Sequence, residues 1–192
     1  MRKTFFVLLV TLFLINLSAA ELLQKTLPNG MEIVVKENFS NNSVGFYCFV
    51  KTGSISEDEH LGKGISHYLE HLVSGGTTSK RTEKEYSEIS KNIGAISNAY
   101  TSKMVTAYHL IVDNTYQDQA LEMLSEHIQF CVLDEYEVER EKQVILKEIV
   151  MSMTPPYSKV SQRNGEVVYP NSNMKYPIIG YTELFKTITR ED

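Results

Sequence analysis

Hydrophobic and polar residues alternate along several short stretches of the chain, and apolar residues recur every three or four positions in longer ones. The short stretches, rich in β-branched and aromatic residues, predict β-strands. These strands cover residues 22–27 and 31–36, joined as a hairpin by Pro28-Asn29-Gly30, then 44–52, and then 93–100 and 104–112 as a second pair. We expect strand 44–52 to be well buried, because it is mostly apolar.

The stretches with a helical period predict helices. They cover residues 64–72, 82–92, 115–130, 134–153 and, as a short helix, 182–187. Between the last two, residues 154–181 contain Gly and Pro residues that interrupt regular structure. Thr82 and Glu85 have the spacing of a capping box. In helix 115–130 the apolar face is a four-residue ladder of Tyr116, Ala120, Leu124 and Ile128. Strands and helices occur in blocks, which favours an α+β fold with helices packed on a mainly antiparallel sheet.

The first twenty residues have the three parts of a secretory signal peptide. Arg2 and Lys3 give a positive start, residues 5–15 are almost continuously apolar, and residues 18–20 are small. The alternative is an uncleaved membrane anchor, but the apolar run is short for a bilayer span. We therefore expect cleavage after Ala20, a mature domain over residues 21–192, and an exported protein that is periplasmic or secreted.

Composition narrows the class of protein. The 192 residues are 42% hydrophobic and 22% charged, as in ordinary globular proteins, with a net charge of −5 that gives no support to nucleic-acid binding. No second segment is long or apolar enough to span a bilayer, so we expect no stable membrane span after cleavage.

Outside the cytoplasm Cys48 and Cys131 could form a disulfide or stay free. Asn38 and Asn41 are glycosylation sites only if the source glycosylates secreted proteins.

The strongest chemical signal is the motif His67-Tyr68-Leu69-Glu70-His71. Residues four apart share a helix face, so His67 and His71 can direct their imidazoles at one point, as two ligands of a tetrahedral zinc ion do. Glu70 lies at the edge of that face, where a carboxylate can take a proton from a zinc-bound water. The order His-x-x-Glu-His is the inverzincin signature. The alternative is two surface histidines that share a helix by chance.

Helix 134–153 offers candidates for a third metal ligand. Its inward stripe is expected to contain Glu141 and Glu148, two turns apart in a line with Val138 and Ile145. Buried acids are costly unless they are paired or bind a metal. If the helix is rotated slightly, both glutamates are instead solvated among neighbouring charges.

The other histidines are weaker candidates. His60 lies in an acidic loop, His109 lies in a predicted strand, and His127 lies on the outer part of an amphipathic helix. Each is more typical of a surface or hydrogen-bonded histidine than of a metal ligand.

Together these motifs resemble the pitrilysin family of zinc metallopeptidases, which includes insulinase and the mitochondrial processing peptidases. The resemblance runs from about Leu22 to Asp192 and rests on five segments: Leu-Pro-Asn-Gly (27–30), Gly-Ile-Ser-His-Tyr-Leu-Glu-His (64–71), Asn-Ala-Tyr-Thr-Ser (98–102), residues 139–149 and Tyr-Pro-Ile-Ile-Gly (176–180). The segment after His71 departs from the family's Phe-x-Gly-Thr form, which affects the expected pocket shape.

The resemblance implies one zinc ion bound by His67, His71 and Glu148. It implies Glu70 as the general base and Glu141 as a second catalytic residue that does not bind the metal. It also implies that the strand edge at Asn98, Ala99 and Tyr100 pairs with an extended peptide substrate.

We therefore expect a zinc metalloendopeptidase that cleaves peptides or unfolded segments, with a glutamate-activated, zinc-bound water as nucleophile. The alternatives are a non-catalytic zinc-containing partner or peptide-binding subunit, and a small-molecule zinc hydrolase. Because family members have two related halves, we also expect a second domain or chain to close the site. Residues 189–192 have the spacing of a capping box with no helix after it, so we expect the N-terminal part of a longer chain.

Overall fold

The computed structural model describes residues 22–192. The predicted signal peptide, residues 1–20, lies outside the described residues. Contacts divide the chain into two compact units, with the boundary between Asn42 and Ser43, and each unit is described by itself. Within residues 22–192 no helix is long and apolar enough to cross a membrane.

The first unit contains the predicted hairpin. Strands β1 (Leu22–Thr26) and β2 (Glu32–Lys36) pair antiparallel, with Leu22 opposite Lys36. The turn needs Gly30, which has a φ of +85°, a conformation that costs glycine little and other residues more. The predicted strand pair is confirmed.

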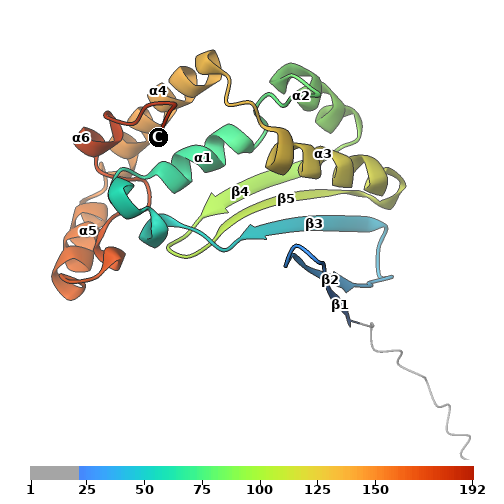
Figure 1. The fold of residues 1–192 in the computed structure, drawn as a ribbon, viewed down its shortest axis with the longest axis horizontal. Coiled ribbons are helices and arrows are strands. Elements are labelled where there is room, and N and C mark those ends of the chain that lie inside the picture. The colour runs from blue at the N-terminus through green and yellow to red at the C-terminus, as the bar shows by residue number, and fades with distance from the viewer. Residues whose placement is uncertain (1–21) are drawn as a thin grey trace, which may run out of the picture. The chain divides into compact units, whose positions relative to one another are not determined.

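The second unit contains a three-stranded antiparallel sheet in the order β3-β5-β4 (Figure 1). Its strands are β3 (Ser43–Val50), β4 (Ile96–Thr101) and β5 (Thr106–Asp113). The predicted pairing of β4 with β5 is confirmed. The expectation that the third strand is well buried was wrong, because β3 lies at an edge of this sheet and alternates half-buried with exposed residues, including Tyr47 and Phe49.

Helices cover one face of this sheet (Figure 1). Of these, α1 (Ile65–Val73) and α3 (Gln117–Phe130) contact the sheet, and α4 (Glu135–Ser152) packs on α1. The remaining helices are α2 (Glu83–Asn92), α5 (Pro156–Val168) and α6 (Thr182–Phe185). Short 3₁₀ turns lie at Ser54–Ser56, Asp58–His60, Asn114–Tyr116 and Asn173–Lys175. The α+β fold is confirmed, but helix α5 was not predicted. It begins at Pro156, which suits the first turn of a helix, whereas Gly165 and its mostly exposed side chains give little periodic signal.

Two apolar clusters hold the layers together. One joins α1, α4 and the C-terminal residues, and it consists of Tyr68, Leu72, Val138, Ile145, Ile149, Phe185 and Ile188. The other joins β5 to α3 and consists of Ile93, Leu110, Val112, Ala120 and Met123. The first cluster fixes α1 against α4, and the second fixes α3 on the sheet.

The buried face of α3 differs from the predicted ladder. Ala120 is buried as expected, but Tyr116 is exposed, and His127 is buried rather than on the outer part of the helix. Helix α2 and the segment that leads into it cover this side of α3. The Arg81 guanidinium bonds the buried Glu126 carboxylate at 2.7 Å, and the Tyr86 ring of α2 packs against His127.

The start of α1 is held by a buried carboxylate. Glu57 accepts hydrogen bonds from the backbone N–H of Ser66 at 2.9 Å and of Gly64 at 3.3 Å. These are N–H groups that the first turn of a helix leaves without helical partners. Burial raises the pKa of Glu57, against the opposing effect of these bonds.

The late segment that ends at Gly180 packs directly on this helix start. A Cβ atom at Gly180 would lie 2.3 Å from the Lys63 carbonyl oxygen, and one at Gly64 would lie 2.5 Å from the Ile179 carbonyl oxygen. Both glycines also have positive φ angles. Backbone–backbone contact therefore fixes where α1 begins.

We predict that Gly180→Ala destabilises the chain more than Gly94→Ala. Both positions have positive φ, which costs about 1–2 kcal/mol for a residue with a Cβ. At Gly94 nothing lies within 4 Å of the added atom, whereas at Gly180 the Lys63 backbone must also move. Denaturant unfolding measures both losses, and equal losses would contradict the close-contact account.

We also predict that His127 makes the chain less stable in acid. Burial lowers the pKa of His127 to about 4, while an unfolded histidine titrates near about 6.5. As pH falls from about 6.5 to 4 the unfolded state binds this proton first, so the free energy of unfolding falls, by at most about 1.4 kcal/mol per pH unit.

The test compares the metal-free chain with His127→Phe, which keeps a ring against Tyr86. The variant should lose stability less steeply between pH 6.5 and 4. Other titrating groups contribute to both proteins, so the difference isolates His127. Parallel curves would show that this histidine does not contribute.

Candidate metal centre

Three side chains from two helices converge at the contact between α1 and α4. His67 and His71 lie one helical turn apart on α1, and Glu148 lies on α4. One donor atom from each of the three side chains lies within 4.8 Å of the other two. Among the described residues, no other group of three or more His, Cys, Asp and Glu side chains has donor atoms this close together. The structure thus brings together the three residues that the resemblance implied as ligands.

The donor atoms fit a zinc ion. A Glu148 oxygen lies 3.9 Å from His67 Nε2, and the other lies 3.6 Å from His71 Nε2. Two ligands about 2.0–2.2 Å from one tetrahedral ion lie about 3.4 Å apart. Two imidazoles and one carboxylate also leave a fourth position for water or substrate, as in catalytic zinc sites.

His67 is kept in the form that binds metals. Burial, followed by the nearby His71, lowers its pKa to about 4, so the imidazole is neutral at neutral pH. Glu148 is the most open member of the group, with 45% of its side chain exposed. The site therefore faces solvent on the α4 side.

Packing beneath the site places Glu148. The Tyr68 ring packs against Phe185 with its centroid 5.3 Å away, and its hydroxyl donates to the Val138 backbone carbonyl of α4. Ile145, one turn before Glu148, is fully buried in the same cluster. The predicted inward stripe of α4 is therefore confirmed for Val138 and Ile145, which are buried. Glu141 and Glu148 lie at the edge of this stripe and are partly exposed.

Glu70 is buried beside the histidines, with 8% of its surface exposed. The Thr101 hydroxyl, at the end of β4, donates to its Oε2 atom at 2.8 Å. Burial raises the pKa of Glu70, and the Thr101 bond acts against this rise. Thr101 was not among the predicted site residues, because only the fold places the end of β4 next to α1.

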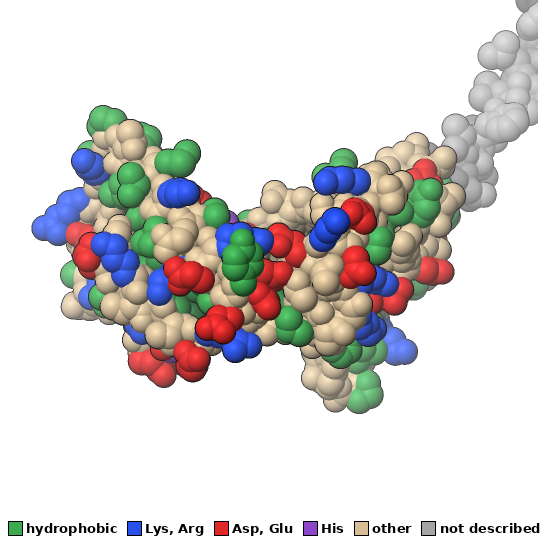
Figure 2. All heavy atoms as spheres, turned by 90° about the horizontal axis from the view of Figure 1, so that it is seen from above, with side chains coloured by type: hydrophobic (Ala, Val, Ile, Leu, Met, Phe, Trp, Pro, Cys, Tyr) green, Lys and Arg blue, Asp and Glu red, His purple; other side chains and the backbone are tan. Residues whose placement is uncertain are grey.

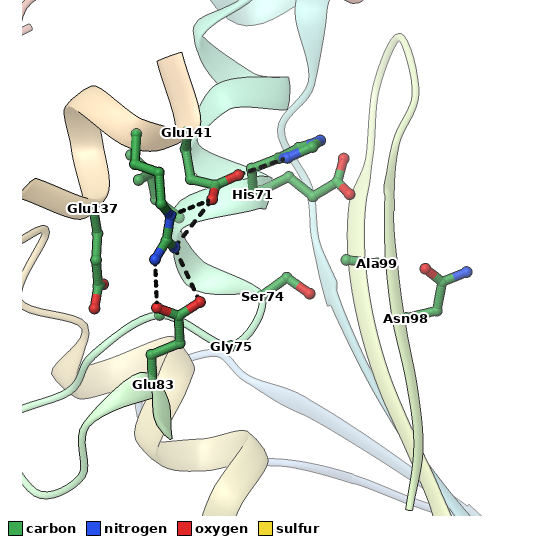
Figure 3. A pocket seen from close by; sticks show the side chains of 12 residues that line it. His71, Ser74, Gly75, Glu83, Asn98, Ala99, Glu137 and Glu141 are labelled. Atoms are coloured by element: carbon green, nitrogen blue, oxygen red, sulfur yellow. Dashed lines mark hydrogen bonds and ion pairs between the residues drawn. The ribbon is translucent and has the colours of Figure 1, made fainter. Parts of the chain in front are cut away.

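Glu141 lies on the other side of His71. Its Oε2 atom is 3.4 Å from His71 Nδ1, and its Oε1 atom accepts from Arg140 at 3.1 Å. Arg140 in turn bonds both oxygens of Glu83, at 2.7 and 3.0 Å (Figure 3). Sequence analysis missed Arg140 and Glu83, because Glu83 is 57 residues away and no periodic pattern links them.

A cavity of about 270 Å³ opens next to these residues. Asn98 and Ala99 of β4 line it together with Glu70, His71 and Glu141, whereas Tyr100 is not part of its wall (Figure 3). Within the described residues β4 pairs only with β5, so its other edge has no strand partner there.

The surface around the centre is rich in acid groups. Four glutamates and one arginine line the cavity, and acidic side chains gather near the middle of the helix face in Figure 2, with basic ones among them.

Of the other histidines, His60 lies near Asp192 and His109 stacks on Tyr47. Neither joins the metal group. Cys48 and Cys131 are both free thiols.

Comparison with known proteins decides the family. A family model described as insulinase (peptidase family M16) matches residues 32–180. This chain belongs to the insulinase family. The predicted resemblance is therefore confirmed.

Relatives of this insulinase-family chain are found in bacteria and plants. It is 35% identical over 158 residues to the uncharacterized zinc protease YmxG of Bacillus subtilis (strain 168), covering 82% of this chain and 38% of that protein. It is 31% identical over 176 residues to a probable mitochondrial-processing peptidase subunit beta of Arabidopsis thaliana, covering 92% of this chain and 33% of that protein. The chain thus spans about a third to two-fifths of these relatives.

A solved structure of a protease from Helicobacter pylori superimposes with a TM-score of 0.82 at 27% identity, covering 90% of this chain and 41% of that one. This chain therefore shares the fold of that protease over nearly its whole length.

Proposed function

We propose that this chain carries the metal-binding and catalytic part of a zinc-dependent peptidase. The observation that carries the proposal is the convergence of His67, His71 and Glu148, with the buried Glu70 on the same helix as both histidines. The names of relatives as zinc proteases support it. Zinc bound by these three residues supplies a Lewis acid that polarises a peptide carbonyl and acidifies a water molecule.

Glu70 is the group that moves protons in this proposal. A carboxylate whose pKa is raised by burial is a better base than a solvated one, since general bases work best with a pKa nearer the working pH. The Thr101 hydroxyl holds one carboxylate oxygen. The other oxygen is then left to accept a proton from water and to return it to the leaving nitrogen.

The free edge of β4 orients the substrate in this proposal. Backbone groups at Asn98, Ala99 and Tyr100 would pair with an extended peptide, which selects an unfolded chain rather than a particular side chain. A second related domain or chain would then close over the peptide. Export to the periplasm or outside the cell also belongs to the proposal, and it rests on the first twenty residues of the sequence.

We predict that Glu70→Gln abolishes peptide cleavage and leaves zinc binding nearly unchanged. Loss of a general base typically costs about 10²–10⁴-fold in rate. The assay follows cleavage of unstructured peptides by mass spectrometry, with a chelator control, beside zinc content by elemental analysis. With the closing domain or chain supplied, cleavage at the unaltered rate in the variant would refute the role of Glu70, and zinc binding by the unaltered chain without any chelator-sensitive cleavage would favour a non-catalytic partner.

We predict that Glu148→Gln weakens zinc binding by about 100-fold or more, since loss of a supporting residue alone costs about 10–100-fold. The matched control is Glu139→Gln on the same helix, whose carboxylate is exposed and bonds Gln143. Competition with a coloured chelator gives both dissociation constants. Equal affinities of the two variants would contradict the ligand role of Glu148.

A further inference from the structure

Arg140 links the metal centre to a separate helix. Its guanidinium lies between two carboxylates, Glu83 at the start of α2 and Glu141 on α4 (Figure 3). The other oxygen of Glu141 faces Nδ1 of His71. A continuous chain of polar contacts therefore runs from α2 through α4 to a histidine of α1.

Helix geometry alone does not bring the side chains of Arg140 and Glu141 together. Residues adjacent in a helix do not face each other, so the guanidinium must turn toward the next carboxylate. Two parallel bonds to Glu83, at 2.7 and 3.0 Å, hold it there in the bidentate geometry that suits arginine.

Glu83 is itself firmly placed. Its backbone N–H donates to the Thr77 hydroxyl at 3.1 Å. It also follows Thr82, whose side chain forms a capping box with Glu85. The anchor of Arg140 is therefore a helix start that is fixed on both sides.

The orientation of Glu141 matters for the histidine. A carboxylate that accepts from Nδ1–H fixes the tautomer and leaves Nε2 free to bind a metal. His71 Nε2 is the atom that faces Glu148, at 3.6 Å. Without Arg140, Glu141 would be free to rotate away from His71 toward solvent.

We propose that Arg140, anchored by Glu83, is a positioning residue that orients Glu141 so that His71 presents Nε2 to the metal. This inference rests on the proposed metal site. The competing account is that Arg140 and Glu83 form a bridge between α2 and α4 that contributes to stability alone.

The test measures Co²⁺ and Zn²⁺ affinity, and the visible spectrum of bound Co²⁺, in the full chain. Arg140→Gln should weaken affinity by about 10–100-fold, as loss of a partner behind a ligand does, and should change the Co²⁺ spectrum. Its melting temperature without metal should change by less than about 4 °C, because the ion pair is partly exposed. Arg140→Lys should restore part of the affinity, and Glu83→Gln should weaken it while leaving the arginine in place.

The matched control is Arg163→Gln, which breaks an exposed Arg163–Glu166 pair of the same 2.7 Å length on α5. It should bind metal as the unaltered chain does. In a Glu141→Gln background, Arg140→Gln should cause no further loss, since the arginine acts through Glu141.

Two results would overturn the inference while the proposed function stands: Arg140→Gln binding metal as tightly as Arg163→Gln, or an undiminished loss in the Glu141→Gln background. Failure of the unaltered chain to bind either metal would instead refute the proposed function itself.

Discussion

The packing of α1 against α4 is the contact on which the rest of the structure depends. Tyr68 and Leu72 point into the same buried cluster as Ile145 and Ile149. Their helix neighbours His67, His71 and Glu148 are thereby forced to the same margin of the interface. The hydrophobic effect thus holds the two helices together, and the helical repeat then places the metal-binding side chains at the edge of the buried cluster.

The backbone around α1 keeps this contact in register. Glu57 caps the helix start, and the segment ending at Gly180 packs against the Lys63 and Gly64 backbone at distances that admit no side chain. This explains why a short segment more than a hundred residues after the His motif belongs to the same functional pattern. It carries no chemistry, but it fixes where the histidine helix begins.

Burial and charge divide the chemical tasks among similar side chains. His67 is held neutral by burial, and Glu70 is held at a raised pKa by the same cause. Glu141 is oriented by a cation, whereas Glu148 stays open to solvent. Four side chains of two types thereby acquire four distinct environments within one small volume.

Much of this could be predicted from local pattern. The His-x-x-Glu-His spacing, the α4 stripe and the capping box at Thr82 are all properties of a few adjacent turns, and the corresponding helices lie where they were expected. The errors concern what covers an element. Burial of His127 depends on Tyr86 and Arg81 from another segment, and Arg140 becomes meaningful only when Glu83 is brought beside it. Long-range contacts of this kind leave no periodic trace in a single sequence.

The most direct test of the central claim is X-ray absorption spectroscopy of the zinc-loaded chain. A centre built by α1 and α4 predicts nitrogen and oxygen neighbours at about 2.0–2.1 Å, with outer-shell scattering from two imidazole rings. Sulfur neighbours at about 2.3 Å, or scattering from fewer than two imidazoles, would show that zinc binds elsewhere and would contradict the account.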